Sequence, residues 1–538
     1  MYQNITLVAI NSKYIHSSLA IYYLKAYSKR DDIRLIDTNI NVDTEDIVDN
    51  IISGKPELVG FSCYIFNIEK VIEAAVELRR KHKCIIFFGG PEVSYENERM
   101  FDYCDRIIEG AGEKAFLSLI NGDSRRKIVG EIVENPLEFS PYTDEYFINS
   151  QNKIAYFEAS RGCPFSCNYC MSSKDKLQLF DIEAVKKELL KFKGKKVKIL
   201  KFADRTFNAK ASFTNEILSF LIEKFSSDEV TFHFEIAPDI LRDDTIGIIA
   251  KAREGLFQFE AGIQTFNDEI LCNTNRKSDV TAAVANIKKL LALGNCHIHS
   301  DLILGLSGEN MTSFRKSFIC LYSLHTHQMQ VGILKVLKGS PLKESYGDEY
   351  VFNACPPYEI LSTPTLSEND VNTGKKISYL IEKYYNSNRF HTTLSLLEEK
   401  YEPFEIFEKL TEIVPYEASL FELYEHIYDF AVSTLKEDEK LINELLKFDY
   451  LSSNNSKNLP PIIKREYSKE FKRVTKNELK KDEFCYYFSF NPMTKEKGEY
   501  VIFFDYKRKN YVTKLYNYRI LDYKLLRKQK ENDELFTD

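Results

Sequence analysis

The chain has 538 residues, of which 44% are hydrophobic and 28% charged, and its formal net charge is −7. This composition is typical of a folded globular protein of more than one domain. The negative balance argues against nucleic acid as the main partner, and no apolar run reaches the ~18 residues of a membrane span. No signal peptide is apparent. The 11 cysteines are an odd number without a secreted disulfide pattern, so we expect a reducing, cytoplasmic compartment.

The first 140 residues alternate between strand-like and helix-like segments, which predicts a doubly wound parallel sheet. The predicted strands are Ile5–Ile10, Ile33–Asp37, Leu58–Cys63, Ile85–Phe88 and Arg106–Glu109, and the helices between them are Ser17–Lys29, Thr44–Ser53 and Ile68–Lys81. Ligands of such sheets bind at the carboxyl ends of the strands. The loops expected to bind a ligand are therefore Asn11–Ser18, Ser62–Asn67, Gly89–Ser94 and Gly110–Glu113. Residues 114–153, which contain two prolines, are predicted to be a linker.

Three cysteines follow the strand-like run Ile154–Glu158. Cys163, Cys167 and Cys170 have the spacing C-x3-C-x2-C. Three thiolates on a short loop can each bind one iron of a 4Fe–4S cluster, and without a fourth cysteine nearby one iron keeps an open position. A zinc knuckle is the alternative, but structural zinc normally takes four Cys or His ligands and no further ligand follows at a suitable spacing. A chance grouping of core cysteines is the other alternative.

Strand-helix alternation resumes from residue 154 to about 345 and predicts a partial (β/α)6 barrel, with its chemistry at the carboxyl ends of the strands. The predicted strands are Ile154–Glu158, Val197–Phe202, Thr231–Ile236, Leu256–Gly262, His297–Leu304 and Gln330–Leu337. Alternation along a strand places Gln258, Glu260 and Gly262 on one face, the expected interior. His297, His299 and Asp301 share a face in the same way, and they could line a pocket or bind a second metal.

The alternation ends near residue 350. Amphipathic helices are predicted over Glu368–Asn386, Phe390–Glu399 and Leu420–Leu435, followed by aromatic, strand-like stretches at Glu483–Phe490, Tyr500–Tyr506 and Tyr511–Tyr516. Basic and aromatic residues together could bind RNA, but this pattern more often forms a solvated face beside a small sheet. The prediction is thus an α/β protein with domains at 1–140, 150–350 and 351–538, the last mostly helical with a small α+β tail.

Several of these motifs resemble one known family. The loop Glu158–Met171 resembles the cluster motif of the radical S-adenosylmethionine (radical SAM) enzymes, and Gly305–Glu309 resembles their Gly-Leu-Pro-Gly-Glu turn, with Ser307 in place of proline. The four N-terminal loops resemble the Rossmann-like cobalamin-binding domain that precedes many radical SAM barrels. The C-terminal region resembles the uncharacterised domain of one subset of these proteins. The resemblance implies a 4Fe–4S cluster, SAM and cobalamin as cofactors.

The resemblance also implies roles for individual residues. SAM would occupy the open iron, be cleaved to a 5′-deoxyadenosyl radical, and contact Phe165, Tyr169, Asp204, Glu235, Glu260 and Gln264. Cobalamin would contact Ser12, Tyr14, Ser62, Tyr64, Gly89, Gly90, Pro91, Glu92, Gly110, Gly112 and Glu113. The cobalt-ligating Asp-x-His-x-x-Gly signature is absent, so we expect His16 to bond locally and cobalamin to be held without a protein axial ligand. As alternatives, Asp204 could pair with Arg205 or cap a helix, and the glutamates could form a structural polar network. The first domain could bind another nucleotide or have lost its ligand.

The implied activity is methyl transfer from a cobalamin-dependent radical SAM enzyme to an unactivated carbon. A cyclase or rearrangement enzyme without methyl transfer is the second hypothesis, and a non-catalytic cobalamin or redox sensor is the third. The expected partners are a small-molecule or peptide substrate and an electron donor such as flavodoxin or ferredoxin, with no membrane.

Overall fold

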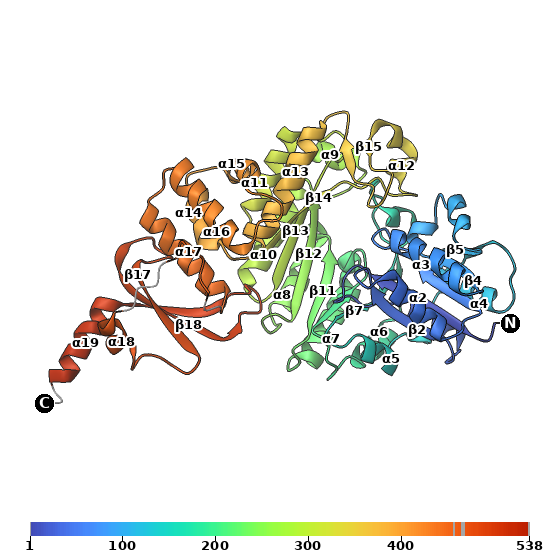
Figure 1. Cartoon of the computed structure of the whole chain (residues 1–538), viewed down its shortest axis with the longest axis horizontal. Helices are drawn as coiled ribbons and strands as arrows, with labels where there is room; N and C mark the ends of the chain where they lie inside the picture. Colours follow the sequence, from blue (N-terminus) through green and yellow to red (C-terminus); the bar gives the residue numbers. More distant parts are fainter. Residues whose placement is uncertain (1, 456–457, 464–467, 536–538) are drawn as a thin grey trace. The chain divides into compact units, whose positions relative to one another are not determined.

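The computed structural model describes residues 2–455, 458–463 and 468–535, and the side chains of 346–347 and 532–535 are left aside (Figure 1). The chain divides into two compact units. The first contains Met1–Cys296, Gly305–Glu309 and Ile333–Ser367, and the second contains His297–Leu304, Asn310–Gly332 and Glu368–Asp538. Among the described residues, no helix is long and apolar enough to cross a membrane.

The N-terminal sheet has six parallel strands in the order β2-β1-β3-β4-β5-β6. They are β1 (Ile5–Asn11), β2 (Arg34–Asn39), β3 (Leu58–Ser62), β4 (Ile85–Gly89), β5 (Arg106–Gly110) and β6 (Lys127–Gly130). Helices α2 (Thr44–Ser53) and α3 (Ile68–Lys81) pack against each other, as do α1 (Ala20–Ser28) and α4 (Gly112–Ile120). Apolar residues of the strands and of α2 and α3 form one buried core. The predicted doubly wound sheet is confirmed.

The expected linker is wrong in part, because residues 114–153 carry regular structure. They contain most of α4, the sixth strand β6, and the short helix α5 (Asp144–Asn149). Strand β6 has four residues, and Val129 is 68% exposed. An edge strand this short shows no alternating pattern, so it could not be recognised from the sequence.

The second sheet has the order β14-β13-β12-β11-β10-β7, so its strands are neighbours in the sheet as they are in the chain. The strands are β7 (Ile154–Phe157), β10 (Ile199–Phe202), β11 (Thr231–Ile236), β12 (Phe257–Gln264), β13 (His297–Leu304) and β14 (Gln328–Ile333). The main helices between them are α6 (Ile182–Leu190), α7 (Ala211–Phe225), α8 (Asp243–Ile249), α9 (Asp268–Asn273), α10 (Val280–Leu293) and α11 (Met311–Tyr322). Phe157, Phe202, Phe234 and Phe259 are buried on the apolar side, ring against ring. The repeat confirms the predicted radical-SAM-like architecture.

Short elements surround these two sheets. They are the strand pairs β8 (Ser160–Arg161) with β9 (Gln178–Leu179) and β15 (Val351–Phe352) with β16 (Ile360–Ser362), and the helix α12 (Pro341–Tyr346).

The C-terminal region consists of helices followed by a three-stranded antiparallel sheet. The helices are α13 (Glu368–Leu380), α14 (His391–Glu398), α15 (Pro403–Ile413), α16 (Leu420–Asp429), α17 (Glu439–Ser453), α18 (Lys469–Thr475) and α19 (Tyr523–Leu535). The strands are β17 (Glu483–Phe490), β18 (Lys497–Lys509) and β19 (Tyr516–Asp522), in the order β17-β18-β19. The predicted strand at Tyr511–Tyr516 is wrong, because this stretch is mostly the turn that precedes β19.

Some aromatic residues of this sheet pack inside the protein, among them Phe488, Phe503 and Phe504, whereas Phe484 and Tyr518 are exposed. Phe448 of α17 contacts the rings of Phe488, Phe504 and Tyr518 on one face. Residues of α18 and α19 form a core on the other face. The buried rings thus build the core of the sheet, and packing accounts for this part of the aromatic pattern.

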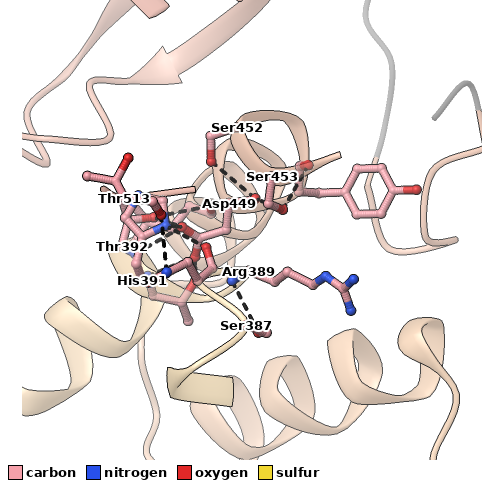
Figure 2. A network of polar contacts seen from close by, with 12 residues as sticks. Ser387, Arg389, His391, Thr392, Asp449, Ser452, Ser453 and Thr513 are labelled. Atoms are coloured by element: carbon pink, nitrogen blue, oxygen red, sulfur yellow. Dashed lines mark hydrogen bonds and ion pairs between the residues drawn. The ribbon is translucent and has the colours of Figure 1, made fainter. Parts of the chain in front are cut away.

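A buried carboxylate connects two C-terminal helices (Figure 2). Asp449 of α17 accepts hydrogen bonds from the backbone amides and hydroxyls of Thr392 and Thr393, at 2.8–3.0 Å. Its carboxylate also lies 3.0 Å from Nδ1 of His391. Asp449 therefore caps the amino end of α14 from a neighbouring helix, which satisfies amides that have no partner within α14.

Candidate active site

A cavity of about 590 Å³ lies in the first unit, and residues that follow strands of both sheets line it. The loops after β1, β3, β4 and β5 contribute from the N-terminal sheet. Tyr156, Glu158, Arg161, Lys201, Ala203, Arg205 and Glu235 contribute from the second sheet. Both sets lie at carboxyl ends of parallel strands, where ligands of such folds bind. The volume is in the range of cofactor and small-molecule sites.

Most residues predicted to contact cobalamin are in the cavity wall. They are Ser12, Ser62, Tyr64, Gly89, Gly90, Gly110, Gly112 and Glu113. Tyr14, Pro91 and Glu92 are not: Tyr14 is 67% exposed, and the other two lie in a short 3₁₀ helix, Pro91–Val93, directly after Gly90. For these three residues the predicted contact is not supported by their place in the structure.

Two glycines of the wall have positive φ angles but different surroundings. Gly110 has φ +80°, and a Cβ atom there would meet only the carbonyl oxygen of Gly130, at 3.7 Å. Gly90 has φ +116°, and its Cβ atom would lie 2.6 Å from the carbonyl oxygen of Cys63. Gly90 is therefore required by the turn itself, whereas a side chain at Gly110 would occupy space beside a ligand.

Glu92 connects its loop to a segment beyond the barrel strands. Its Oε1 atom lies 2.6 Å from Nζ of Lys338 and accepts a hydrogen bond from the hydroxyl of Tyr358. Glu96 pairs with Lys343 at 2.7 Å. Because Glu92 is 6% exposed, this ion pair is buried, and breaking it would leave an uncompensated charge.

His16 lines the cavity and bonds locally, as expected. Its Nδ1 atom lies 2.8 Å from the hydroxyl of Tyr156. Burial lowers the pKa of His16, and the nearby Lys13 and Lys201 lower it further. The imidazole is therefore neutral at pH 7 and already has a partner.

A charged network covers the interior face of strands β10, β11 and β12. Nζ of Lys201 lies 3.3 Å from Glu260 and 3.5 Å from Glu235, and Nε2 of His233 lies 3.1 Å from Glu260. The hydrogen bond from His233, together with the charge of Lys201, lowers the pKa of Glu260 to about 2. Burial instead raises the pKa of Glu235. Of these two predicted SAM contacts, only Glu235 is in the cavity wall.

The cluster loop brings the three cysteines near polar groups that the sequence did not indicate. Sγ of Cys163 lies 3.4 Å from the hydroxyl of Thr206, and Arg276 donates to Sγ of Cys167 at 3.8 Å. Across the described residues, no three His, Cys, Asp or Glu side chains converge to hold a single metal ion. Three thiolates that each bind a different iron of a cluster need no common point.

Residues after α9 hold the same loop from outside. Arg276 also donates to the hydroxyl of Tyr169 at 3.4 Å and to the carbonyl oxygen of Gly262 at 2.7 Å. Asn275 donates to the backbone and hydroxyl of Ser166. Sequence analysis missed Arg276, Asn275 and Thr206, because their contacts join segments about 40 to 110 residues apart and no local pattern marks them.

Asp204 has a different environment from the one predicted. Its carboxylate accepts hydrogen bonds from the amide of Ala159, at 3.0 Å, and from the hydroxyl of Ser160. It is 2% exposed, and burial raises its pKa to about 7. Asp204 thus holds the start of the cluster loop, whereas Arg205 is exposed in the cavity.

Gln264 is strained and only partly bonded at the end of β12. It has φ +72° without being glycine, and its buried Oε1 atom has no hydrogen-bond partner among the described residues. Such strained positions occur preferentially at functional sites. The remaining predicted SAM contact, Phe165, is half-buried in the cluster loop.

His297, predicted to line a pocket or bind a metal, packs in the second unit. It stacks on His327 at 4.9 Å and lies 2.6 Å from the carbonyl oxygen of Val512. Burial, with the charges of His299 and His327, lowers the pKa of His297 to about 2. These contacts give His297 a packing role.

Three family models match consecutive parts of the chain. The B12 binding domain matches residues 5–120, the radical SAM superfamily matches 157–318, and the protein of unknown function DUF4080 matches 344–532. The chain therefore contains a B12-binding domain followed by a radical SAM domain. The matches confirm the predicted combination of domain families and, at that level, the predicted cofactors: a 4Fe–4S cluster, SAM and cobalamin.

Curated proteins similar to this chain include two methyltransferases. The chain is 23% identical to 2-(S-pantetheinyl)-carbapenam-3-carboxylate methyltransferase of Streptantibioticus cattleyicolor, over 53% of this chain and 48% of that protein. It is 23% identical to the cobalamin-dependent radical SAM methyltransferase TokK of Streptomyces tokunonensis, over 62% of this chain and 54% of that protein. The chain thus spans about half the length of these relatives.

A solved structure shares the fold. TsrM of Kitasatospora setae, determined with cobalamin and a 4Fe–4S cluster bound, superimposes with a TM-score of 0.53 at 14% identity, covering 65% of this chain and 76% of that one.

The residues of this chain fit the cofactors of its domain families. Three free thiols lie on one loop, which is the donor set that an iron–sulfur cluster requires. The orphaned Oε1 atom of Gln264 offers a partner to a SAM donor group. Around a Cβ atom at Gly110, only the carbonyl oxygen of Gly130 lies within 4 Å, so the cavity wall is open at this position.

Proposed function

We propose that this radical SAM protein is a cobalamin-dependent methyltransferase acting on an unactivated carbon. The observation that carries the proposal is the single cavity, whose wall combines residues of the B12-binding range with residues of the radical SAM range. When bound, the cluster supplies the electron that cleaves SAM, and cobalamin supplies a carrier for the methyl group. A substrate in this cavity would be within reach of both.

The protein's own residues would bind and position these groups. Cys163, Cys167 and Cys170 would hold the cluster, and Glu235 and Gln264 would bind SAM. The loops that contain Ser12, Ser62, Gly89 and Gly110 would hold the corrin. Lys201, which pairs with Glu235 and Glu260, would hold these carboxylates beside the reacting groups.

The setting proposed here is cytoplasmic, with flavodoxin or ferredoxin as electron donor and a small molecule or peptide as substrate. A cyclase or rearrangement activity remains the second candidate function, because the same cavity and the same cofactors would serve it.

Anaerobic reconstitution tests the proposal. The cluster-loaded protein should retain cobalamin through gel filtration and release 5′-deoxyadenosine from SAM under reducing conditions. A substrate product heavier by one methyl group supports methyl transfer, and a product without it supports the second candidate. Protein that binds no corrin would contradict both activities, and corrin binding without SAM cleavage would indicate a sensor.

A further inference from the structure

Arg161 lies in the cluster loop and pairs with a carboxylate of the B12-binding range. One of its nitrogens, Nη2, lies 2.8 Å from Oε1 of Glu113 and 3.0 Å from Oε2 of Glu158. Nε donates to the same oxygen of Glu158 at 3.1 Å. The guanidinium also lies over the ring of Tyr23, 5.2 Å from its centre. Three side chains from three segments of the chain thus meet at Arg161.

This ion pair is buried, unlike most others in the unit. The side chain of Glu113 is 6% exposed and that of Arg161 24%. Charges withdrawn from water interact more strongly and resist movement, because separating them leaves an unpaired buried charge. A guanidinium also binds carboxylates in a fixed planar geometry, so the contact restrains orientation as well as distance.

The two loops joined by this contact have different roles in the proposed function. Glu113 lies in the first turn of α4, and together with the preceding residues Gly110–Gly112 it lines the cavity on the B12-binding side. Arg161 is two residues before Cys163, and Glu158 is at the end of the strand that leads into the cluster loop. No covalent connection shorter than 47 residues links Glu113 to Arg161. A side-chain contact is therefore the direct link between them.

We propose that Arg161, held by Glu113 and Glu158, is a positioning residue that fixes the cluster loop relative to the corrin-binding loop. The inference rests on the proposed function, since it assigns one cofactor to each loop. Both carboxylates are needed. Glu158 binds Arg161 at the end of the strand that precedes the cluster loop, and Glu113 binds Arg161 from the N-terminal sheet.

The variant Glu113→Gln tests this directly, because it removes a charge from one loop and leaves the other loop unaltered. In full-length, cluster-loaded, corrin-free protein, the rate of hydrogen exchange should rise at two protected amides. The amide of Ala159 donates a hydrogen bond to the carboxylate of Asp204, and the amide of Cys163 donates one to the carbonyl oxygen of Asp175. A roughly tenfold increase in the exchange rate corresponds to a loss of about 1.4 kcal/mol of local stability. The matched control is Glu109→Gln, four residues earlier, which removes only a 3.9 Å pair with the half-exposed Lys127.

A second measurement uses the protein with both cofactors. Pulsed electron paramagnetic resonance gives the distance between cob(II)alamin and the reduced cluster. Glu113→Gln should broaden or shift this distance at unchanged iron content, Glu109→Gln should match wild type, and Arg161→Lys, which keeps the charge, should lie closer to wild type than Arg161→Gln.

The outcomes separate the inference from the proposed function. Unchanged exchange at residues 159–163 and an unchanged distance in Glu113→Gln would overturn the inference alone. Corrin lost from Glu113→Gln without faster exchange in the cluster loop would show that Glu113 binds the corrin itself, which also overturns it. Wild-type protein without corrin would refute the proposed function, and the exchange measurement alone would then decide whether the two loops are coupled.

Discussion

Replacing Asp204 should destabilise the first unit in a pH-dependent manner. The carboxylate accepts hydrogen bonds from the amide of Ala159 and the hydroxyl of Ser160, and it is 2% exposed. Asp204→Ala leaves both buried donors without an acceptor, at a cost of about 1–3 kcal/mol for each. We therefore expect the free energy of unfolding to fall by about 3 kcal/mol. Asp204→Asn keeps one acceptor oxygen, so its free energy of unfolding should fall less than that of Asp204→Ala.

The pH dependence follows from the raised pKa of Asp204, about 7 as a consequence of burial, compared with about 3.9 in an unfolded chain. Between these values the folded protein holds a proton that the unfolded chain has released. The contribution of this group to stability is therefore complete below about pH 4 and is lost as the pH rises through 7, with a slope of at most about 1.4 kcal/mol per pH unit. Asp204→Asn cannot titrate, so its stability relative to wild type should improve with rising pH.

Urea unfolding of cluster-free protein, followed by circular dichroism at pH 5, 6, 7 and 8 under reducing conditions, measures both effects. Removal of the cluster separates the stability of the loop anchor from that of the metal site. An unchanged unfolding midpoint in Asp204→Ala would refute the anchoring role, and parallel pH profiles for wild type and Asp204→Asn would refute the raised pKa of Asp204. In cluster-loaded protein, SAM affinity lost from Asp204→Asn without loss of stability would support the direct SAM contact instead.

Three further predictions follow from individual contacts. Replacing Cys163, Cys167 and Cys170 together by Ala should abolish both iron content and cluster absorbance near ~400 nm after reconstitution, and full iron content would contradict the cluster assignment. Gly110→Val should block cobalamin retention by filling space beside the ligand. His16→Ala should retain cobalamin, because His16 already forms a hydrogen bond with Tyr156. The reverse pattern in gel filtration would reveal a missed cobalt ligand. Asp449→Ala should lower the free energy of unfolding of the C-terminal unit by about 3 kcal/mol, measured by urea unfolding, while Asp522→Ala, at an exposed cap, should change it little.

The fold was predictable where apolar periodicity is strong. Strands such as β1 and β13 were located to within one residue, because buried parallel strands are near-continuous apolar runs. Strand β6 was missed because its four residues, at the edge of the sheet, show no alternation of apolar and polar side chains. The prediction of which β12 residues share the interior face was correct, because alternation along a strand is fixed by backbone geometry. Gln258, Glu260 and Gly262 are less buried than the residues between them.

The candidate site was predictable at the level of loops but less so for individual side chains. Glycines and polar residues after each strand marked the loops that line the cavity. The same rule placed Glu92 and Asp204 beside cofactors, whereas the structure gives them protein partners, Lys338 and the amide of Ala159. Position after a strand tells only that a residue is near the sheet edge. Which partner a buried carboxylate finds depends on segments that the local sequence does not specify.

The protein partners of these buried charged groups restrict the geometry of the cavity loops. Arg161 with Glu113, Lys338 with Glu92, and Asp204 with Ala159 each join a cavity loop or its neighbour to a segment at least 45 residues away. A buried ion pair adds little net stability compared with apolar packing, but it restricts the geometry in which its groups can be satisfied. The radical chemistry proposed for this cavity would require such restriction, because a displacement of about 1 Å can cost roughly 10²-fold in rate. Buried charges around this cavity are therefore better explained by the need to fix its loops than by the stability they contribute.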